Sequence, residues 1–245
     1  MFVIIGIVTV FACVLGGYVA MGGKLAVLWE PFEVVIIVGA AIGAVIIGNL
    51  KSVIGKLGNG FGAAAKGPKY KKDDYIELLS VQYQIFKMAR AKGMLALEAH
   101  VENPDESDLF NQFPGFHDNH HAVTFICDYL RSMSLGSESL HEMADLMDEK
   151  IEMHHHENHR VAAAIQAIAD ALPALGIVGP IAQVLGAVHE AETKCYQCMK
   201  AGMLAYLNGY APVVCVEFAR KALESDVRPT FYEVEEAVSA LPAVG

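Results

Sequence analysis

Four histidines that stand close together are the first residues whose types and spacing could support chemistry. They occupy positions 154, 155, 156 and 159 in EKIEMHHHENHR, and a helix would place His155 and His159 on one face. Two imidazoles at i, i+4 can bind Zn²⁺. The string is not an HExxH motif, however, and it lies in a densely charged segment. A solvated or interfacial histidine run is therefore the better interpretation, and no metal site is predicted.

Cysteine is the other residue type with chemical potential. Cys195 and Cys198 form a single Cys-x-x-Cys pair among five cysteines. It has no second pair and no strand-turn-helix context, so it predicts neither a metal site nor a redox site. We expect no cofactor and no catalytic residue.

Two apolar segments near the N-terminus are long enough to anchor the chain in a membrane. The stretch Pro31–Leu50 has no charged side chain from Val34 to Gly48, and the first segment has none before Lys24. About 20 such residues span a ~30 Å hydrocarbon layer as a helix. A signal peptide is disfavoured because no basic region precedes the apolar run. Residues 1–50 are thus predicted to form a hairpin of two transmembrane helices.

Lysine dominates the segment that follows. Six lysines lie between Lys51 and Lys72, and no acid occurs there before Asp73. An excess of lysine beside an apolar span marks its cytoplasmic side. Pro68 and the many glycines argue against a long helix across residues 51–72, which we expect to be a linker.

The overall composition agrees with a membrane protein. The 245 residues are 54% hydrophobic and 19% charged, with a mean hydropathy of +0.36. That is too apolar for an ordinary soluble domain. The net charge of −10 and the absence of a basic stripe elsewhere argue against nucleic acid as a partner.

The polar part of the chain reads as helices. Helical spacing of apolar residues, with Asp73 or Asp74 as a cap and Gly93 as a stop, predicts the first of them. Gly209 and Pro212 should interrupt the predicted helix over residues 193–220. The expected helices cover residues 75–92, 94–101, 120–137, 139–160, 193–220 and 231–239. The predicted fold is all-α, with a cytoplasmic domain at 51–160 and a cytoplasmic tail at 191–245.

Several strings carry a family resemblance. They are GGYVAMGGKLAVLWEPFEVVIIVGAAIGAVIIGN, ARAKGMLALEAHVENPDESDLF, IADALPALGIV, AYLNGYAPVVCVEFARKAL and VRPTFYEVEEAV. In this order, over most of the chain, they resemble the MotA/PomA family of flagellar motor stator subunits, within the wider family of ExbB and TolQ.

The resemblance implies a function. Members of that family form a ring of five around two copies of MotB, which carries the ion-accepting Asp and anchors to peptidoglycan. Ion flow turns the ring, whose cytoplasmic domain pushes the rotor protein FliG. A multi-pass protein of the bacterial inner membrane is implied, not an enzyme, and H⁺ is expected as the transported ion ahead of Na⁺.

The resemblance also implies two charged residues that face the rotor. Arg90 in ARAKG and Glu98 in LALEAHVENP match the family's rotor-facing Arg and Glu. Spacing alone would leave them as solvated surface charges. Each exposed ion contact contributes only ~0–1 kcal/mol, which suits a contact that forms and breaks repeatedly.

Two prolines follow in the same way. Pro173 in PALGIV and Pro180 in GPIA resemble prolines near the cytoplasmic ends of the family's third and fourth membrane helices. A proline leaves a backbone carbonyl free and kinks a helix, so it can form a hinge or an ion-lining carbonyl, or simply improve packing.

The sequence departs from the family between these prolines. PALGIV runs directly into GPIAQVLGAV at Val178–Gly179, so most of two membrane helices is absent and residues 161–190 are a remnant. One apolar stretch, Ala171–Val188, remains, and a single crossing there would put the tail outside the cell. Either residues are missing from the record or the gene carries the deletion.

Three functions stay open at this point. The first is a stator subunit, the second an ExbB/TolQ-type transducer of ion-motive force, and the third an inactive, internally deleted stator remnant. The VRPTFYEVEEAV tail and the strings around Arg90 and Glu98 favour a stator protein over the ExbB/TolQ type.

Overall fold

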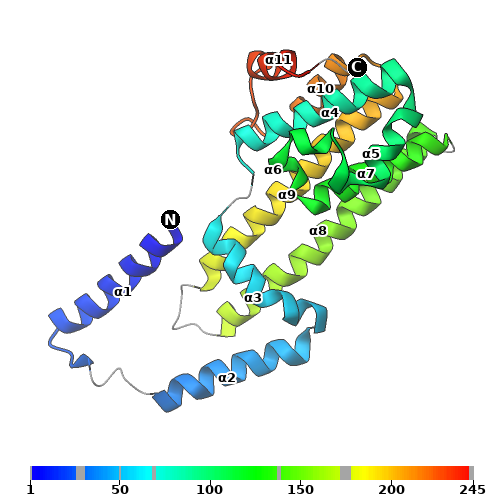
Figure 1. The fold of residues 1–245 in the computed structure, drawn as a ribbon. Helices are drawn as coiled ribbons and strands as arrows, with labels where there is room; N and C mark the ends of the chain where they lie inside the picture. Colours follow the sequence, from blue (N-terminus) through cyan, green and yellow to red (C-terminus); the bar gives the residue numbers. More distant parts are fainter. Residues whose placement is uncertain are drawn as a thin grey trace. The chain divides into compact units, whose positions relative to one another are not determined.

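The computed structural model contains helices and connecting turns, and no strand occurs in the residues that it describes (Figure 1). These residues are 2–25, 31–49, 51–67, 70–136, 139–171 and 178–242. The α-helices are α1 (Phe2–Ala20), α2 (Pro31–Gly48), α3 (Lys51–Lys66), α4 (Lys72–Lys92), α5 (Glu98–Glu102), α6 (Pro114–His117), α7 (His120–Leu135), α8 (Leu140–Ala171), α9 (Val178–Leu207), α10 (Pro212–Lys221) and α11 (Phe231–Ser239). The all-α prediction is confirmed.

The chain divides into two compact units that interleave along the sequence. Unit 1 comprises Met1–Lys69 and His155–Glu190, and unit 2 comprises Tyr70–His154 and Ala191–Gly245. Each unit is therefore built from two separate segments of the chain. The long helices α8 and α9 contribute residues to both.

The prediction of a linker over residues 51–72 is wrong, because most of that segment is helix α3. Val53 and Ala64 of α3 are buried in the core of unit 1, while Lys51 and Lys56 are exposed. The core is completed by side chains of α2, α8 and α9: Val45, Val161, Ala164, Ile165, Ala182 and Leu185. Burial of this apolar face outweighs the poor helix propensity of glycine.

Gly60 shows why a glycine stands in the middle of α3. A Cβ atom at this position would lie 3.2 Å from Leu185, 3.3 Å from Ile165 and 3.3 Å from Val161. These contacts are tighter than ordinary van der Waals distances, so α3 approaches α8 and α9 closely only because residue 60 lacks a side chain. The glycine here serves helix packing.

Helices α8 and α9 run antiparallel. In unit 1, Ile165 of α8 lies in one cluster with Leu185 of α9. In unit 2, the ring of His154 contacts the ring of Tyr196, with 5.0 Å between their centroids. As the residue number rises along α8, its neighbour's number falls along α9, which is the pattern of an antiparallel pair.

This arrangement contradicts a single membrane crossing between Ala171 and Val188. The stretch is divided between the end of α8 and the start of α9, and its residues 172–177 lie outside the described part. Side chains from both segments of unit 2 share one hydrophobic core, so those segments lie on the same side of any bilayer.

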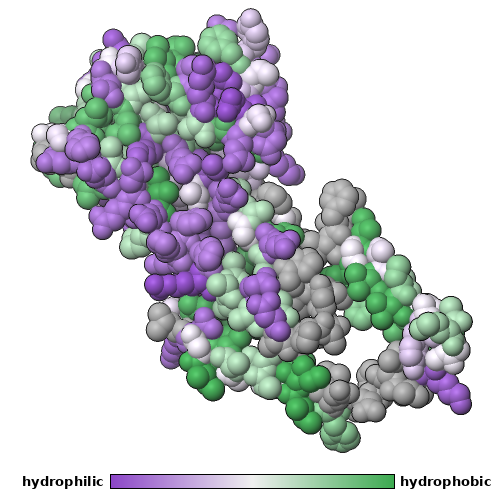
Figure 2. Space-filling model, turned by 180° about the vertical axis from the view of Figure 1, so that it is seen from behind, coloured by the Kyte–Doolittle hydropathy of each residue, from purple (hydrophilic) through white to green (hydrophobic). Residues whose placement is uncertain are grey.

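Apolar side chains cover the two N-terminal helices of unit 1. Ile4 and Val8 of α1 and Ile36 and Ile47 of α2 are between 61% and 88% exposed. Figure 2 shows largely hydrophobic faces on these helices, whereas polar side chains predominate on the visible face of unit 2. Within the described residues, no helix combines the length and hydropathy that crossing a membrane requires.

The core of unit 2 brings α4 together with the C-terminal helices. Ile85 and Phe86 of α4 are fully buried, as are Met199 of α9 and Cys215 of α10. The ring of Phe86 stacks on Tyr206, with centroids 5.1 Å apart and planes within 10°. Segments more than 100 residues apart in sequence therefore depend on one another for burial.

Helix α11 covers the residues that the sequence predicted, 231–239, and a capping box begins it. The Thr230 hydroxyl accepts a hydrogen bond from the Glu233 backbone N–H, and the Glu233 carboxylate accepts one from the Thr230 backbone N–H. The Lys72 ammonium of α4 lies 2.6 Å from the same carboxylate. These hydrogen bonds, that of Lys72 foremost, lower the pKa of Glu233 to about 2.

We expect Gly60→Leu to destabilise unit 1 by about 1–3 kcal/mol, because the new side chain overpacks the α3 contact with α8 and α9. Gly58→Leu is the matched control, since a Cβ at Gly58 meets nothing within 4 Å. Leucine there should stabilise the helix by about 0.5–1 kcal/mol. Thermal unfolding of the purified variants measures both changes, and equal shifts would contradict the close packing of α3.

We expect Glu233 to make unit 2 acid-sensitive. Its folded pKa of about 2 lies below the ordinary value of 4.5, so its contribution is present above pH 4.5 and is lost as pH falls towards 2. Urea unfolding of Glu233→Gln should depend less on pH in this window than the unmodified chain. Glu236→Gln, which changes an exposed carboxylate without a described partner, should leave the pH dependence unchanged.

Candidate functional site

Arg90 lies near the C-terminal end of α4 and is exposed. Its Nη1 donates a hydrogen bond to the backbone carbonyl of Tyr210, at 3.2 Å. That carbonyl is available because the chain breaks between α9 and α10, where Gly209 has a φ of +82° and Pro212 begins the next helix. The break predicted at Gly209 and Pro212 is confirmed, and it supplies Arg90 with its partner.

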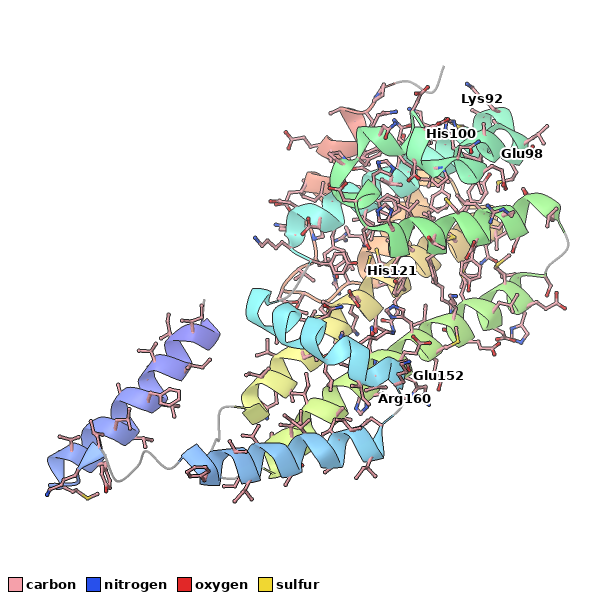
Figure 3. All side chains as sticks on the ribbon, turned by 60° about the horizontal axis from the view of Figure 1, so that its bottom comes forward. Lys92, Glu98, His100, His121, Glu152 and Arg160 are labelled. Atoms are coloured by element: carbon pink, nitrogen blue, oxygen red, sulfur yellow. The ribbon has the colours of Figure 1, made fainter. Side chains whose placement is uncertain are left out.

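The second carried-over residue, Glu98, stands on a different element. Gly93, with a φ of +85°, ends α4, and the 3₁₀ helix η2 (Met94–Leu97) leads into α5. Glu98 is the first residue of α5 and is exposed, and no hydrogen bond or ion pair to its carboxylate occurs among the described residues. Figure 3 shows Glu98 and Lys92 at the end of unit 2 where α4 gives way to η2 and α5.

An arginine of α7 holds α5 in place. Arg131 Nε lies 2.7 Å from the Glu102 carboxylate, Nη1 lies 3.3 Å from Asp128, and Nη2 lies 3.5 Å from the Val101 carbonyl oxygen. The hydrogen bond with Glu102 raises the pKa of the Arg131 guanidinium above its ordinary value. Leu97 and Val101 are buried, so burial of apolar side chains and the Arg131 contacts both attach η2 and α5 to the rest of unit 2.

A shallow groove beside Glu98 completes this surface. Its apolar lining comes from η2, α5 and α7 and consists of Met94, Leu97, Val101, Leu130 and Leu135. Leu95 and Leu135 are 77% and 75% exposed. The exposed carboxylate of Glu98 therefore stands at the edge of an apolar depression, a surface suited to contact with another protein.

The two carried-over prolines flank the start of α9 in the sequence. Pro173 falls outside the described residues. Pro180 is the third residue of α9, and its side chain is likewise outside the described part. Their role in ion conduction remains a prediction from the sequence.

The histidines and cysteines make no metal cluster among the described residues. His155 and His159 do share a face of α8, with ring centroids 6.2 Å apart. His154 instead packs edge-on against Tyr196, and its ring lies 6.3 Å from that of His121. This aromatic contact needs a partner from α9, which periodicity within α8 does not reveal.

The cysteine pair is part of the core of unit 2. Cys195 and Cys198 are buried and no disulfide joins them. Desolvation raises the pKa of the Cys198 thiol well above its ordinary value, and a protonated buried thiol is a poor nucleophile. Gln82 Nε2 donates a hydrogen bond to Cys198 Sγ, at 3.9 Å.

The arrangement described so far defines an all-helical protein with apolar N-terminal helices and a polar helical unit that carries exposed charges. Residues 4–93 match the family model described as Motility protein A N-terminal. Motility protein A of Salmonella typhimurium is 35% identical over 98% of this chain and 96% of its own length, and that of Escherichia coli K12 shows the same values. Chemotaxis protein LafT of Vibrio parahaemolyticus is 28% identical over 95% of this chain and 96% of its own.

The chain belongs to the motility protein A (MotA) family of flagellar motor stator proteins, which are not enzymes. The comparison also shows that this chain lacks positions that its relative has. The alignment with the Salmonella protein spans 283 positions, whereas this chain has 245 residues, so at least 38 aligned positions have no counterpart here. The sequence placed missing positions at Val178–Gly179, the first two residues of α9, as either unrecorded residues or a deletion in the gene.

We expect Arg131→Gln to loosen α5, because the substitution removes the ion pair with Glu102 and weakens the contact with α7. Loss of one or two such hydrogen bonds corresponds to about 0.5–1.5 kcal/mol, or roughly a 2- to 10-fold faster exchange of α5 amide hydrogens. Hydrogen exchange read by mass spectrometry checks this. Lys150→Gln, an exposed change on α8, should leave α5 protected as before.

Proposed function

We propose that this chain is the MotA-type subunit of a flagellar stator, which couples ion flow across the inner membrane to rotation and applies torque to FliG. MotB is its partner and supplies the ion-accepting carboxylate. The chain assembles as a ring of five, and H⁺ is the transported ion. Belonging to the motility protein A family supports the general assignment, and the exposed charges of unit 2 support the rotor contact.

The proposed contact with the rotor is supported chiefly by the positions of Arg90 and Glu98. Both are exposed, and they flank the turn at Gly93 on adjoining elements of unit 2. Arg90 is oriented by Tyr210, and α5 with Glu98 is held by Arg131. Opposite charges on rigid supports can meet complementary charges on a rotor, and each contact is weak enough to release.

The membrane attachment rests on α1 and α2. Their exposed isoleucine and valine side chains would face water in a soluble protein, at a cost of about 25 cal/mol for each Å² of apolar surface. We place α1 and α2 in the inner membrane and unit 2 in the cytoplasm. Both segments of unit 2 belong on that side in this proposal, because they share one hydrophobic core.

A second candidate function follows from the missing positions. A chain that lacks at least 38 positions of its relatives could fold unit 2 and contact a rotor without conducting ions. No observation favours an ExbB/TolQ-type role, since the relatives are named for motility and chemotaxis.

Complementation separates the two candidates. If the chain is a working stator subunit, its expression with MotB should restore swimming to a strain that lacks its own MotA. If it is a remnant, the strain should stay non-motile although the protein reaches the membrane at normal abundance. Failure to reach the membrane would contradict both.

In a motile background, we expect Arg90→Glu or Glu98→Lys to reduce swimming in part, and the two together to reduce it further, because each ion contact supplies only ~0–1 kcal/mol. Glu106→Lys is the control, since this glutamate of η3 (Pro104–Glu106) is also exposed. Swimming speed and membrane abundance are measured together. An equal loss of swimming in the control would show that surface charge in general, and not this pair, matters.

A further inference from the structure

Positive charge is concentrated in the segment that directly follows α2. Six of the 18 basic residues lie between positions 51 and 72, and none of the 28 acidic residues does. The chain as a whole carries a net charge of −10. A negatively charged membrane surface would therefore repel most of this protein and attract this segment.

The structure shows how sharply apolar surface changes to basic surface here. Ile47, in the last turn of α2, is 88% exposed. The Asn49 side chain then donates to the Val45 carbonyl at 3.0 Å, which satisfies a carbonyl at the end of the helix. Lys51 opens α3 four residues after Ile47 and is exposed. The surface thus changes from apolar to basic within four residues of sequence, as expected at the boundary between the hydrocarbon layer and the lipid headgroups.

One face of α3 packs against the core of unit 1, and its two lysines are exposed. Val53, Gly60 and Ala64 face the core of unit 1, so they fix how the helix lies on α8 and α9. Lys51 and Lys56 remain exposed on the helix. Lys56 pairs with Glu157 at 3.5 Å, but both side chains are more than half exposed, and such a pair is weak enough for a headgroup phosphate to compete.

We propose that α3 is a lipid-binding helix whose Lys51 and Lys56 bind the headgroups of anionic phospholipids at the inner face of the membrane. Clusters of lysine just beyond an apolar helix are attracted to anionic headgroups, and this attraction falls off within a Debye length. The inference rests on the proposed insertion of α1 and α2. It adds a lipid class as a ligand and α3 as the surface that recognises it.

The test uses the full chain reconstituted into vesicles made of equal parts phosphatidylcholine and phosphatidylglycerol. The protein is then extracted in a non-ionic detergent, and the retained lipids are quantified by mass spectrometry. We expect phosphatidylglycerol to be retained over phosphatidylcholine. In the double variant Lys51→Gln/Lys56→Gln, the preference should fall by roughly 5-fold or more. The control Lys92→Gln/Lys150→Gln removes the same charge from exposed positions of unit 2 and should keep the preference.

The outcomes are distinguishable. Flotation of the reconstituted vesicles on a density gradient first shows whether the protein is inserted. A chain that does not float with the vesicles overturns the proposed insertion and this inference with it. A chain that floats but whose lipid preference survives the Lys51/Lys56 change overturns the lipid site alone. A further arm adds inorganic phosphate to the wash. If free phosphate displaces the phosphatidylglycerol, then α3 binds phosphate as such, and the assignment to a lipid surface is wrong.

Discussion

The packing of α4 against the C-terminal helices is the constraint on which the rest of this structure depends. Phe86 stacks on Tyr206, and Met199 and Cys215 are buried in the same core. Because the two segments of unit 2 need one another for burial, they must lie on one side of a bilayer. Under the proposed membrane attachment, the chain between those segments can cross the bilayer only an even number of times.

The same packing orients the charges assigned to rotor contact. Arg90 is bonded to the carbonyl of Tyr210, which stands 120 residues further along the chain. The corner between α9 and α10 thus acts as a support for a side chain on α4. Glu98 has its own support through Arg131 on α7, which fixes α5. Two exposed charges that could have been mobile are thereby held on separate elements whose positions the core determines.

Unit 1 illustrates how glycine and lysine can mislead when they are read locally. A segment rich in both looks like a linker, since glycine weakens isolated helices. Here Gly60 permits close contact with α8 and α9, and the apolar face that includes Val53 and Ala64 supplies the burial that the isolated helix would lack. The lysines are left on the outside of a rigid helix, where their charge can act on a surface. The proposed lipid contact follows from that placement.

Local signals in the sequence determined the all-helical class, the stop at Gly93, the break at Gly209 and Pro212, and the start of the last helix at Phe231. The stop, the break and the start depend on a positive φ, a missing N–H or a capping side chain, and such effects are confined to a few residues. Only the tertiary structure decided that α3 is a helix, that α8 and α9 return antiparallel, that Tyr210 orients Arg90 and that His154 packs on Tyr196. These features depend on partners distant in sequence, whose proximity is set by burial in a shared core.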